Sequence, residues 1–405
     1  MTRRRCEAGT LELGAGLEVL VSASLATLQD GDLLDVVVDS RSGSLELPAW
    51  ARRAGHDVVD ERRSGEAYVV TLRPRITGPP AGGPALDAPT FPTSELRRLA
   101  GAEEREADRN RGLVPLGALP EPSAARYDWA LSSRDRVWTD KLASLTDRAA
   151  RAQWDATRDV PWEAVAGLRP DAERAVAQVM TYIAQNEYAA YYVPARYLTQ
   201  VNPEYVEVLM WLASHVHDEA RHVEVFTKRA LAGGQRAYAL AATELSLQTL
   251  LDERDFSAAA LLLNVLGEGT FLDLLSFVAR HAPDAATATA ARLAHQDERR
   301  HVQFGIAHIR HRLVHDPDEQ QRLVASVEGR AAKLVSLDGL SPVVGESLVL
   351  MASRSAQPSD IGDAGRAVRD LLGRMNRNRV RRLRAAGFDR AIAQRLSELH
   401  TPNLM

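Results

Sequence analysis

The sequence predicts a mostly helical protein, built on a four-helix bundle with extra helices and preceded by a small α+β domain. Three observations support this prediction. The chain has 405 residues, enough for two or three domains at about 150 residues each. A stretch rich in proline and glycine follows residue 75 and marks a boundary. Beyond it these residues become sparse, and apolar residues recur with the 3.6-residue period of helices.

Residues 1–75 mix helical periodicity with the alternation of strands, so we predict a small α+β domain with one sheet. A turn is expected at Asp30-Gly31-Asp32. The expected elements are a helix over Leu17–Leu28, a strand over Leu33–Val38, a short helix over Leu47–Ala54, and strands over Asp57–Glu61 and Ala67–Leu72.

Residues 76–125 are expected to form a linker between this domain and a helical domain over residues 126–405. The stretch contains Gly78-Pro79-Pro80 and Gly82-Gly83-Pro84, which can continue neither a helix nor a strand ladder. The helical domain contains four long periodic segments, at roughly 171–200, 203–232, 256–281 and 285–314. Three of them open on helix-start signals, namely Pro170-Asp171, Asn202-Pro203 with Asn202 as the N-cap, and Pro283-Asp284.

The composition excludes several classes of protein. Hydrophobic residues make up 45% of the chain and the net charge is -4, so we expect no nucleic-acid partner. The apolar run between Asp255 and Glu268 is too short to span a membrane, and the start lacks the apolar region of a secretory signal. We therefore expect a soluble, cytoplasmic protein without a membrane partner. The single cysteine, Cys6, excludes an internal disulfide, a cysteine-ligated zinc site and an iron–sulfur cluster.

Each of the four long helices carries a carboxylate at an interior position, and two of them carry a Glu-x-x-His motif. Glutamate and histidine at i and i+3 lie on one helical face, so both can contact one metal ion. The motif occurs twice as Asp-Glu-x-Arg-His, and the spacing within each helix pair is similar, 219 − 187 = 32 and 298 − 268 = 30 residues. The candidate metal ligands are Glu187, Glu219, His222, Glu268, Glu298 and His301.

A single Glu-x-x-His motif is usually part of a solvated helix face. Here Glu268 lies within an apolar run from Leu261 to Leu272, so its carboxylate is expected to be buried. A buried, unpaired charge is costly unless a metal or a partner neutralises it. Four glutamates and two histidines suit two divalent ions, with iron as the default and manganese as an alternative. Gly267 and Gly269 flank Glu268 and leave room either for a small substrate pocket or for close helix packing.

With these motifs, residues 150–315 resemble the ferritin-like di-iron carboxylate proteins, and the Glu-x-Arg-His form resembles the bacterial multicomponent monooxygenase hydroxylases. The resemblance implies that the six residues are ligands of two metal ions that activate O₂. It also implies that Asp218 and Asp297 accept the outer imidazole N–H groups. Arg221 and Arg300 would then pair with these two carboxylates.

Two positions distinguish this chain from particular families of ferritin-like proteins. The ribonucleotide reductase small subunit has a radical tyrosine one turn after its first ligating histidine, where this chain has Phe226. His215 lies four residues before Glu219. The p-aminobenzoate N-oxygenase family carries a third histidine with this offset, but on its second motif. His215 is therefore either an extra ligand or a histidine of the surrounding core.

The N-terminal domain resembles the TusA-type sulfur-carrier fold through the segments Leu25–Val36, Leu47–His56 and Tyr68–Leu72. That family transfers persulfide sulfur from a Cys-Pro-x-Pro motif at the start of its first helix. The motif is absent here, and Cys6 precedes its expected place by eight residues, in a tail that we expect to be unstructured. The resemblance thus implies a docking or scaffolding module.

The function expected from these features is that of a non-haem di-iron oxygenase, which activates O₂ to hydroxylate or oxidise a carbon or nitrogen centre of a small organic substrate in secondary metabolism. The alternatives are a ferroxidase or oxidase without oxygen insertion, and a non-catalytic metal-binding or redox-sensing protein. The substrate could be carrier-bound. Without an internal iron–sulfur group, electrons must come from an external reductase or ferredoxin. The chain could also form a homodimer. The arginines between Arg374 and Arg390 are expected on a solvated helix face, or as a docking face for an acidic partner.

Overall fold

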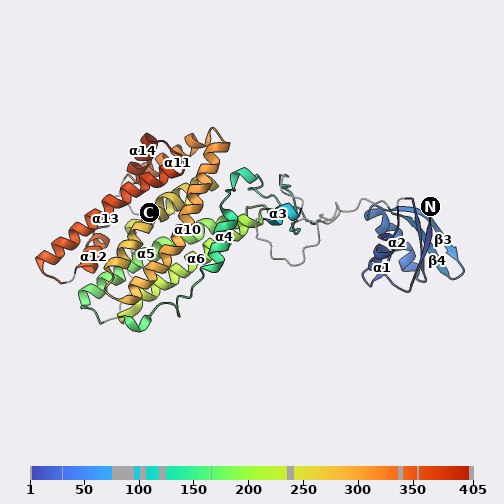
Figure 1. Cartoon of the computed structure of the whole chain (residues 1–405), viewed down its shortest axis with the longest axis horizontal. Helices are drawn as coiled ribbons and strands as arrows, with labels where there is room; N and C mark the ends of the chain where they lie inside the picture. Colours follow the sequence, from blue (N-terminus) through green and yellow to red (C-terminus); the bar gives the residue numbers. More distant parts are fainter. Residues whose placement is uncertain are drawn as a thin grey trace. The chain divides into compact units, whose positions relative to one another are not determined.

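The computed structural model describes residues 2–29, 31–74, 95–100, 106–116, 118, 125–165, 167–234, 241–335, 341–353 and 355–400. The chain divides into two compact units, Met1–Pro89 and Thr90–Met405. Among the described residues, the first unit holds the sheet and the second is almost entirely helical (Figure 1). This is the predicted fold class.

The N-terminal unit has one mixed four-stranded sheet and two helices. Strand order is β1-β2-β4-β3, with β1 parallel to β2 and the other neighbours antiparallel. Apolar residues of both helices pack against the sheet residues Val36 and Val70. The elements are β1 (Arg3–Gly9), α1 (Leu17–Leu25), β2 (Leu33–Val38), α2 (Arg41–Arg53), β3 (Asp57–Ser64) and β4 (Ala67–Arg73).

Strand β1 was not predicted, and its presence corrects the expectation for Cys6. Cys6 is buried in β1, opposite Val36 of β2, rather than in an unstructured tail. The strand begins with three exposed arginines, so its alternation of buried and exposed residues is hard to see in the sequence. Helix α2 also begins earlier than predicted, because Ser40 caps it by accepting a hydrogen bond from the Gly43 amide at 2.9 Å. The resemblance of this unit to the sulfur-carrier fold stays a prediction.

Residues 76–125 were predicted to form a linker, and the part up to residue 94 lies outside the described residues. Several described residues beyond it contact the helical unit. Arg97 Nη1 donates to the Glu204 carbonyl oxygen at 3.0 Å, and Arg111 forms a buried ion pair with the Glu204 carboxylate at 3.0 Å. These residues therefore belong with the helical unit rather than with a free linker, because their polar groups pair with those of the bundle.

The helical unit is built around four long helical segments that match the predicted ones. Helix α5 packs along α6, and α10 packs against α6, α9 and the π-helical segment η5; Figure 1 shows α5, α6 and α10 running alongside one another. Helix α8, η5 and α9 follow one another without interruption from Phe256 to His281. The four segments are α5 (Pro170–Leu198), α6 (Val206–Leu231), α8–η5–α9 (Phe256–Ala260, Leu261–Gly267 and Glu268–His281) and α10 (Ala285–His315).

Shorter elements surround this bundle. Helices α12 and α13 pack against α5 and α9, respectively, and α14 packs against α11 and α13. These elements are α3 (Leu96–Leu99), η2 (Arg134–Arg136), α4 (Leu142–Arg151), η3 (Trp162–Ala164), η4 (Ala232–Gly234), α7 (Ala241–Asp252), α11 (Glu319–Lys333), α12 (Pro342–Ala352), α13 (Pro358–Ala385) and α14 (Arg390–His400).

Helix starts were predicted with mixed success. Pro170 is the first residue of α5, and Asp284 caps α10 by accepting from the Thr287 amide at 2.7 Å. The prediction of Asn202 as an N-cap was wrong, because α6 begins only at Val206. The Asn202 Oδ1 instead accepts from the Glu204 amide at 3.0 Å, and its Nδ2 donates to the Asp108 carbonyl oxygen at 2.9 Å, so the side chain holds a turn that precedes the helix.

Arginines of α13 and Gly269 of α9 lie in other surroundings than the sequence suggested. Arg379 is buried, and its Nη1 donates to the Ser397 carbonyl oxygen at 3.0 Å. The Arg382 side chain occupies the space beside Gly269, where a Cβ would lie 3.0 Å from its Cδ. These two arginines therefore do not lie on a solvated face, and Gly269 serves close packing between α9 and α13 rather than a substrate pocket.

Helix Phe256–His281 is long and apolar enough to cross a membrane, with a mean hydropathy of 1.5 in its most apolar window. However, 89% of that window is buried inside the unit. This is the pattern of a core helix in a soluble protein.

We predict that Gly305→Ala destabilises the protein. A Cβ at Gly305 would lie 2.6 Å from the Cβ of Asn264 and 3.4 Å from the Ala260 carbonyl oxygen, so α10 would have to move away from η5. Overpacking of this kind costs about 1–3 kcal/mol, more than the gain of up to about 1 kcal/mol in helix propensity.

The matched control is Gly329→Ala in α11, where a Cβ would meet nothing within 4 Å. Its propensity gain should stabilise the protein. Denaturant unfolding of both variants checks the pair, and equal stabilisation by both would show that the contact between α10 and η5 tolerates a methyl group.

Candidate metal centre

The structure brings all six predicted ligands and His215 together in the middle of the four-helix bundle. Their ligand atoms form two groups, and within each group the atoms lie within 4.8 Å of one another. All seven side chains are buried, and Glu219 belongs to both groups. One group contains Glu187, Glu219, His222 and Glu298, and the other contains His215, Glu219, Glu268 and His301.

Two carboxylates lie between the two imidazoles that face them. The oxygens of Glu219 lie 3.1 Å from His222 Nδ1 and 2.9 Å from His301 Nδ1. Those of Glu298 lie 3.5 Å from each of the same nitrogens. A carboxylate that reaches both imidazoles in this way can bridge two metal ions.

Several of these buried atoms have no hydrogen-bond partner. Buried polar groups in proteins are nearly always hydrogen-bonded, so each exception needs an explanation. The unpartnered atoms include both carboxylate oxygens of Glu187 and both of Glu298. Oxygen and imidazole donors that converge without protein partners are what two divalent ions require. The residues therefore fit a di-metal cofactor.

The protonation behaviour of the glutamates reflects the same crowding. Burial raises the pKa of Glu187 well above its usual value, and the charges of Glu219 and Glu298 raise it further. Burial also raises the pKa of Glu298, and the Glu219 and Glu268 carboxylates add to the effect. Bringing these negative charges together in a dry interior is unfavourable, and bound cations would relieve this repulsion.

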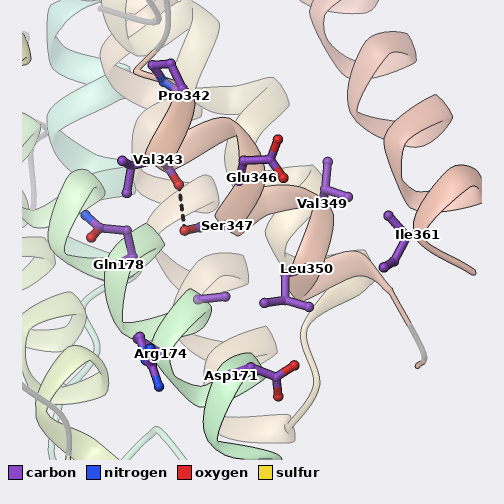
Figure 2. Close-up of a pocket in the computed structure, with 11 residues that line it drawn as sticks. Asp171, Arg174, Gln178, Pro342, Val343, Glu346, Ser347, Val349, Leu350 and Ile361 are labelled. Atoms are coloured by element: carbon purple, nitrogen blue, oxygen red, sulfur yellow. Dashed lines mark hydrogen bonds between the residues drawn. The ribbon is translucent and has the colours of Figure 1, made fainter. Parts of the chain in front are cut away.

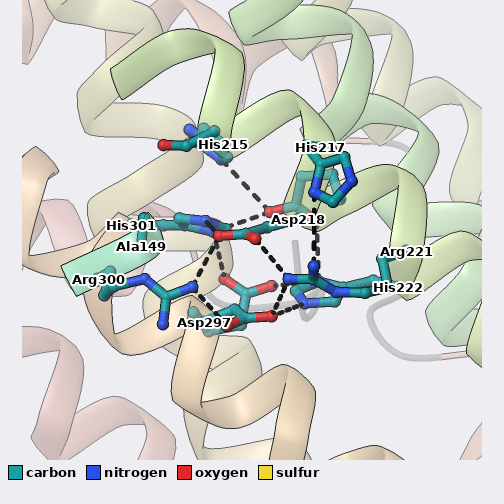
Figure 3. A network of polar contacts seen from close by, with 12 residues as sticks. Ala149, His215, His217, Asp218, Arg221, His222, Asp297, Arg300 and His301 are labelled. Carbon is teal, nitrogen blue, oxygen red and sulfur yellow. Dashed lines mark hydrogen bonds and ion pairs between the residues drawn. The ribbon is translucent and has the colours of Figure 1, made fainter. Parts of the chain in front are cut away.

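The two motifs cross over to hold each other's histidine, as Figure 3 shows. His222 Nε2 lies 3.2 Å from Asp297 Oδ2, and His301 Nε2 lies 3.3 Å from Asp218 Oδ2. Each aspartate thus comes from the helix opposite the histidine it contacts. An Nε2–H donor to a carboxylate leaves Nδ1 unprotonated and turned toward the glutamates. This is the position that the resemblance implied for Asp218 and Asp297.

Two arginines tie the aspartates together. Arg221 Nη2 donates to Asp218 at 2.5 Å and to Asp297 at 3.0 Å, and Arg300 Nη2 donates to Asp218 at 2.8 Å and also to Asp297. Although burial opposes ionisation of Asp218, the hydrogen bond from His301 and the Arg300 charge hold its pKa below the usual value. The four side chains therefore form a buried, charge-balanced network beside the ligands.

His215 lies next to the predicted ligands, which the sequence could not decide. Its Nε2 lies 3.0 Å from Glu268 Oε1 and 3.3 Å from Glu219 Oε1, and its ring stacks on His301 with centroids 3.8 Å apart. Of the two sequence-based alternatives, an extra ligand or a core histidine, its place in the second group of ligand atoms favours the first.

Sequence reasoning missed two residues of this centre. Asn264, in η5, donates from Nδ2 to Glu268 Oε2 at 2.7 Å. Trp154 donates from Nε1 to Asp297 Oδ2 at 2.7 Å, and its ring lies under the Arg221 guanidinium at 4.6 Å. An asparagine four residues before Glu268 could have signalled the first contact, since i and i+4 share a helical face. The second joins segments 143 residues apart.

These observations decide the type of bundle. Two helices each supply one inward glutamate, and the two others each supply an inward Glu-x-x-His motif, which is the arrangement of ferritin-like di-metal proteins. The helical unit has a ferritin-like fold.

No family model and no curated protein matches the chain. Solved structures similar to it include an R2-like ligand-binding oxidase with an aerobically reconstituted Mn/Fe cofactor, at 16% identity and a TM-score of 0.42, covering 66% of this chain and 95% of that chain. Another is an R2-like ligand-binding oxidase after photoconversion of its aerobically reconstituted metal cofactor, at 15% identity and a TM-score of 0.41, covering 65% and 91%.

Two cavities of the ferritin-like unit differ in their relation to the centre. A small one of about 20 Å³ adjoins it and is lined by His215, Asn264 and apolar residues that include Phe256, Leu263 and Phe304. A larger one of about 640 Å³ lies between α5 and α12, where Ser347 donates to the Val343 carbonyl oxygen (Figure 2). None of the predicted site residues lines the larger cavity.

We predict that Asp297→Asn weakens metal binding. The substitution removes the negative charge of the carboxylate that contacts His222 and leaves Asp218 as the one carboxylate that contacts both arginines. Loss of such a partner of a ligating histidine costs about 10–100-fold in metal affinity. Titration of the chelator-treated protein with Fe²⁺ or Co²⁺ measures the effect, and Asp218→Asn should act in the same way through His301.

Asp252→Asn on α7 is the control, since Asp252 contacts Gln248 and not an imidazole. Unchanged affinity in Asp297→Asn, with unfolding midpoints matching the wild type, would contradict the orienting role.

Proposed function

We propose that the protein is an O₂-activating oxidoreductase with a non-haem di-metal cofactor, either two iron ions or a manganese and an iron ion. The observation that carries this proposal is the pair of overlapping ligand groups in a buried site, with Glu219 and Glu298 spanning both imidazoles. Glu187 and His222 would complete one ion's ligands, and Glu268, His301 and His215 the other's. When bound, such ions supply redox equivalents and Lewis acidity for the reaction with O₂.

The surrounding protein supplies a dry and rigid enclosure. Leu263, Val265 and Leu266 next to Glu268 are all buried, which keeps water away from reactive species. Asn264 holds one oxygen of Glu268, while Asp297 and Asp218 hold the imidazoles. These contacts limit how far the carboxylates and rings can turn during the reaction.

An external electron donor fits this proposal. Because the chain has one cysteine, a cysteine-ligated electron carrier within it is excluded. A hydrogen-bonded chain joins the half-buried Trp154 to Asp297 and then to His222, and it offers a route from near the surface to the centre. The N-terminal unit would act as a docking module. Its partner would be either the reductase or a protein that carries the substrate.

Oxygen insertion at a carbon or nitrogen centre of a small organic substrate is our first candidate reaction. The apolar cavity beside His215 and Asn264 is the place where O₂ or a substrate group can approach the centre, because its lining contains no charged side chain other than His215 if protonated. A cationic or anionic substrate group would not be stabilised there.

Oxidation without oxygen insertion is the second candidate reaction. The small volume of the same cavity favours it. About 20 Å³ is enough for roughly one water-sized molecule, so O₂ fits while an organic substrate requires the helices around η5 to move.

The test is to load the chelator-treated protein with Fe²⁺ and mix it with O₂ in a stopped-flow spectrometer. We expect two ions per chain and an O₂-dependent visible absorption change. Glu268→Ala should lose two-metal occupancy, because it removes a ligand of the second group. A wild-type protein that binds fewer than two ions, or whose spectrum does not respond to O₂, would contradict the proposal.

Turnover separates the two candidates. A ferroxidase oxidises many Fe²⁺ ions per chain without a reductant, whereas an oxygenase retains its two ions and needs electrons from a donor for each cycle. Trp154→Phe keeps an aromatic ring but removes the donor to Asp297, so it should slow reduction by an external donor. Exposed Tyr188→Phe on α5 serves as the aromatic control.

A further inference from the structure

The C-terminal half of α13 concentrates positive charge. Between Asp370 and Asp389 the chain contains six arginines and neither an aspartate nor a glutamate. The structure separates these arginines by their position on the helix. Arg379 and Arg382 are covered by neighbouring helices, as described above, whereas three others are exposed to solvent: Arg377, Arg381 and Arg384.

The three exposed arginines follow one face of α13. They are spaced by four and three residues, so their side chains lie in a row about 10 Å long along the helix axis. The opposite face is buried, because Leu371 and Leu383 are inaccessible to solvent. Helix α13 packs against α9, α12 and α14 and runs along the outside of the helical unit (Figure 1). The row of arginines therefore points away from the core of this unit.

A fourth arginine joins this row from another helix. Arg310, exposed on α10, donates from Nε to the Ala385 carbonyl oxygen at 2.9 Å. Ala385 directly follows Arg384 and is the last residue of α13, so the contact fixes the Arg310 guanidinium at the end of the row. We call these four residues the basic face: Arg310, Arg377, Arg381 and Arg384.

The charges of the basic face are not balanced within the described part of the chain. The ion pairs of α13 there involve its other arginines, and none involves a residue of the basic face. Arg381 donates to the neutral Asn378 side chain at 3.2 Å. Like charges three or four residues apart weaken a helix. A cation in the last turn interacts favourably with the helix dipole, which explains Arg384 but not Arg377, two turns earlier.

The residue type and the charge of the whole chain indicate the kind of partner that would balance this face. The guanidinium group binds a carboxylate through two parallel N–H···O bonds, and arginine is enriched in protein–protein interfaces. Nucleic acids and anionic membranes present negative charge over a far longer surface than this row. Their long-range attraction is opposed by the net charge of -4 of the chain.

We propose that the basic face is a docking surface for an acidic partner protein, one that presents a row of carboxylates over about 10 Å. Each guanidinium would bind one carboxylate, and the complementary charges would raise the rate of association. Salt screens exposed charges, so the complex should weaken as the ionic strength rises. The proposal does not depend on the proposed oxidoreductase function, because it needs neither a bound metal ion nor turnover.

The experiment uses the full-length protein and a fluorescent peptide of ten glutamates, with binding followed by fluorescence anisotropy at low ionic strength. We expect salt-sensitive binding that falls at least tenfold when Arg377→Glu, Arg381→Glu and Arg384→Glu are combined. The corresponding triple lysine variant should lose part of the affinity, because lysine keeps the charge but not the two parallel hydrogen bonds. Unfolding midpoints close to that of the wild type check that both variants are folded.

The matched control changes the net charge equally at exposed positions outside the basic face, by combining Arg151→Glu, Arg158→Glu and Arg292→Glu. It should keep most of the peptide affinity. Equal losses in the two glutamate variants, or no binding by the wild type, would overturn the proposal. The same holds if a DNA duplex or vesicles of anionic lipid bind more tightly than the peptide and lose this binding in the α13 glutamate variant.

Discussion

The repulsion between four buried glutamates is the constraint on which the helical unit depends. Glu187, Glu219, Glu268 and Glu298 come from four different helices and meet where water is excluded. An isolated buried carboxylate costs several kcal/mol even after the protein relaxes, so this arrangement requires compensating positive charge. The imidazoles provide part of it through their contacts, and bound metal ions would provide the rest. The unpartnered carboxylate oxygens mark where those ions belong.

The surrounding contacts form a second layer that is arranged with the same approximate symmetry as the ligands. Asp218 and Asp297 exchange partners across the bundle, each contacting the histidine of the other's helix, and both arginines contact both aspartates. Because the aspartate of each helix contacts the histidine of the other, a shift of α6 would move a contact of α10, and the reverse. The network therefore couples α6 to α10. The symmetry ends at His215, Asn264 and Trp154, which contact one side of the centre only. These residues would make two metal ions bound there chemically different.

Much of this architecture was predictable because it depends on local pattern. Helix periodicity located the four long helices to within a few residues, and the repeated Asp-Glu-x-Arg-His motif located glutamates, histidines and aspartates that the structure brings together in the bundle. Predictions failed where a distant segment competes with a local preference. Asn202 is a good N-cap by type, but it holds a turn ahead of α6 and contacts Asp108. Arg379 is buried and Arg382 is largely covered by neighbouring helices, although both look solvated by composition. The strand β1 was missed because its pairing with β2 is a long-range event.

The sequence by itself determined the kind of chemistry, since the residue types and the i, i+3 spacing of the two motifs already specify a carboxylate and histidine site for two ions. Only the tertiary structure decided whether His215 joins that site, because its distance from Glu268 depends on how α6 and α9 pack. It also decided the size of the adjoining cavity. Spacing along one helix is set by local geometry, whereas contacts between different helices depend on the packing of the whole bundle.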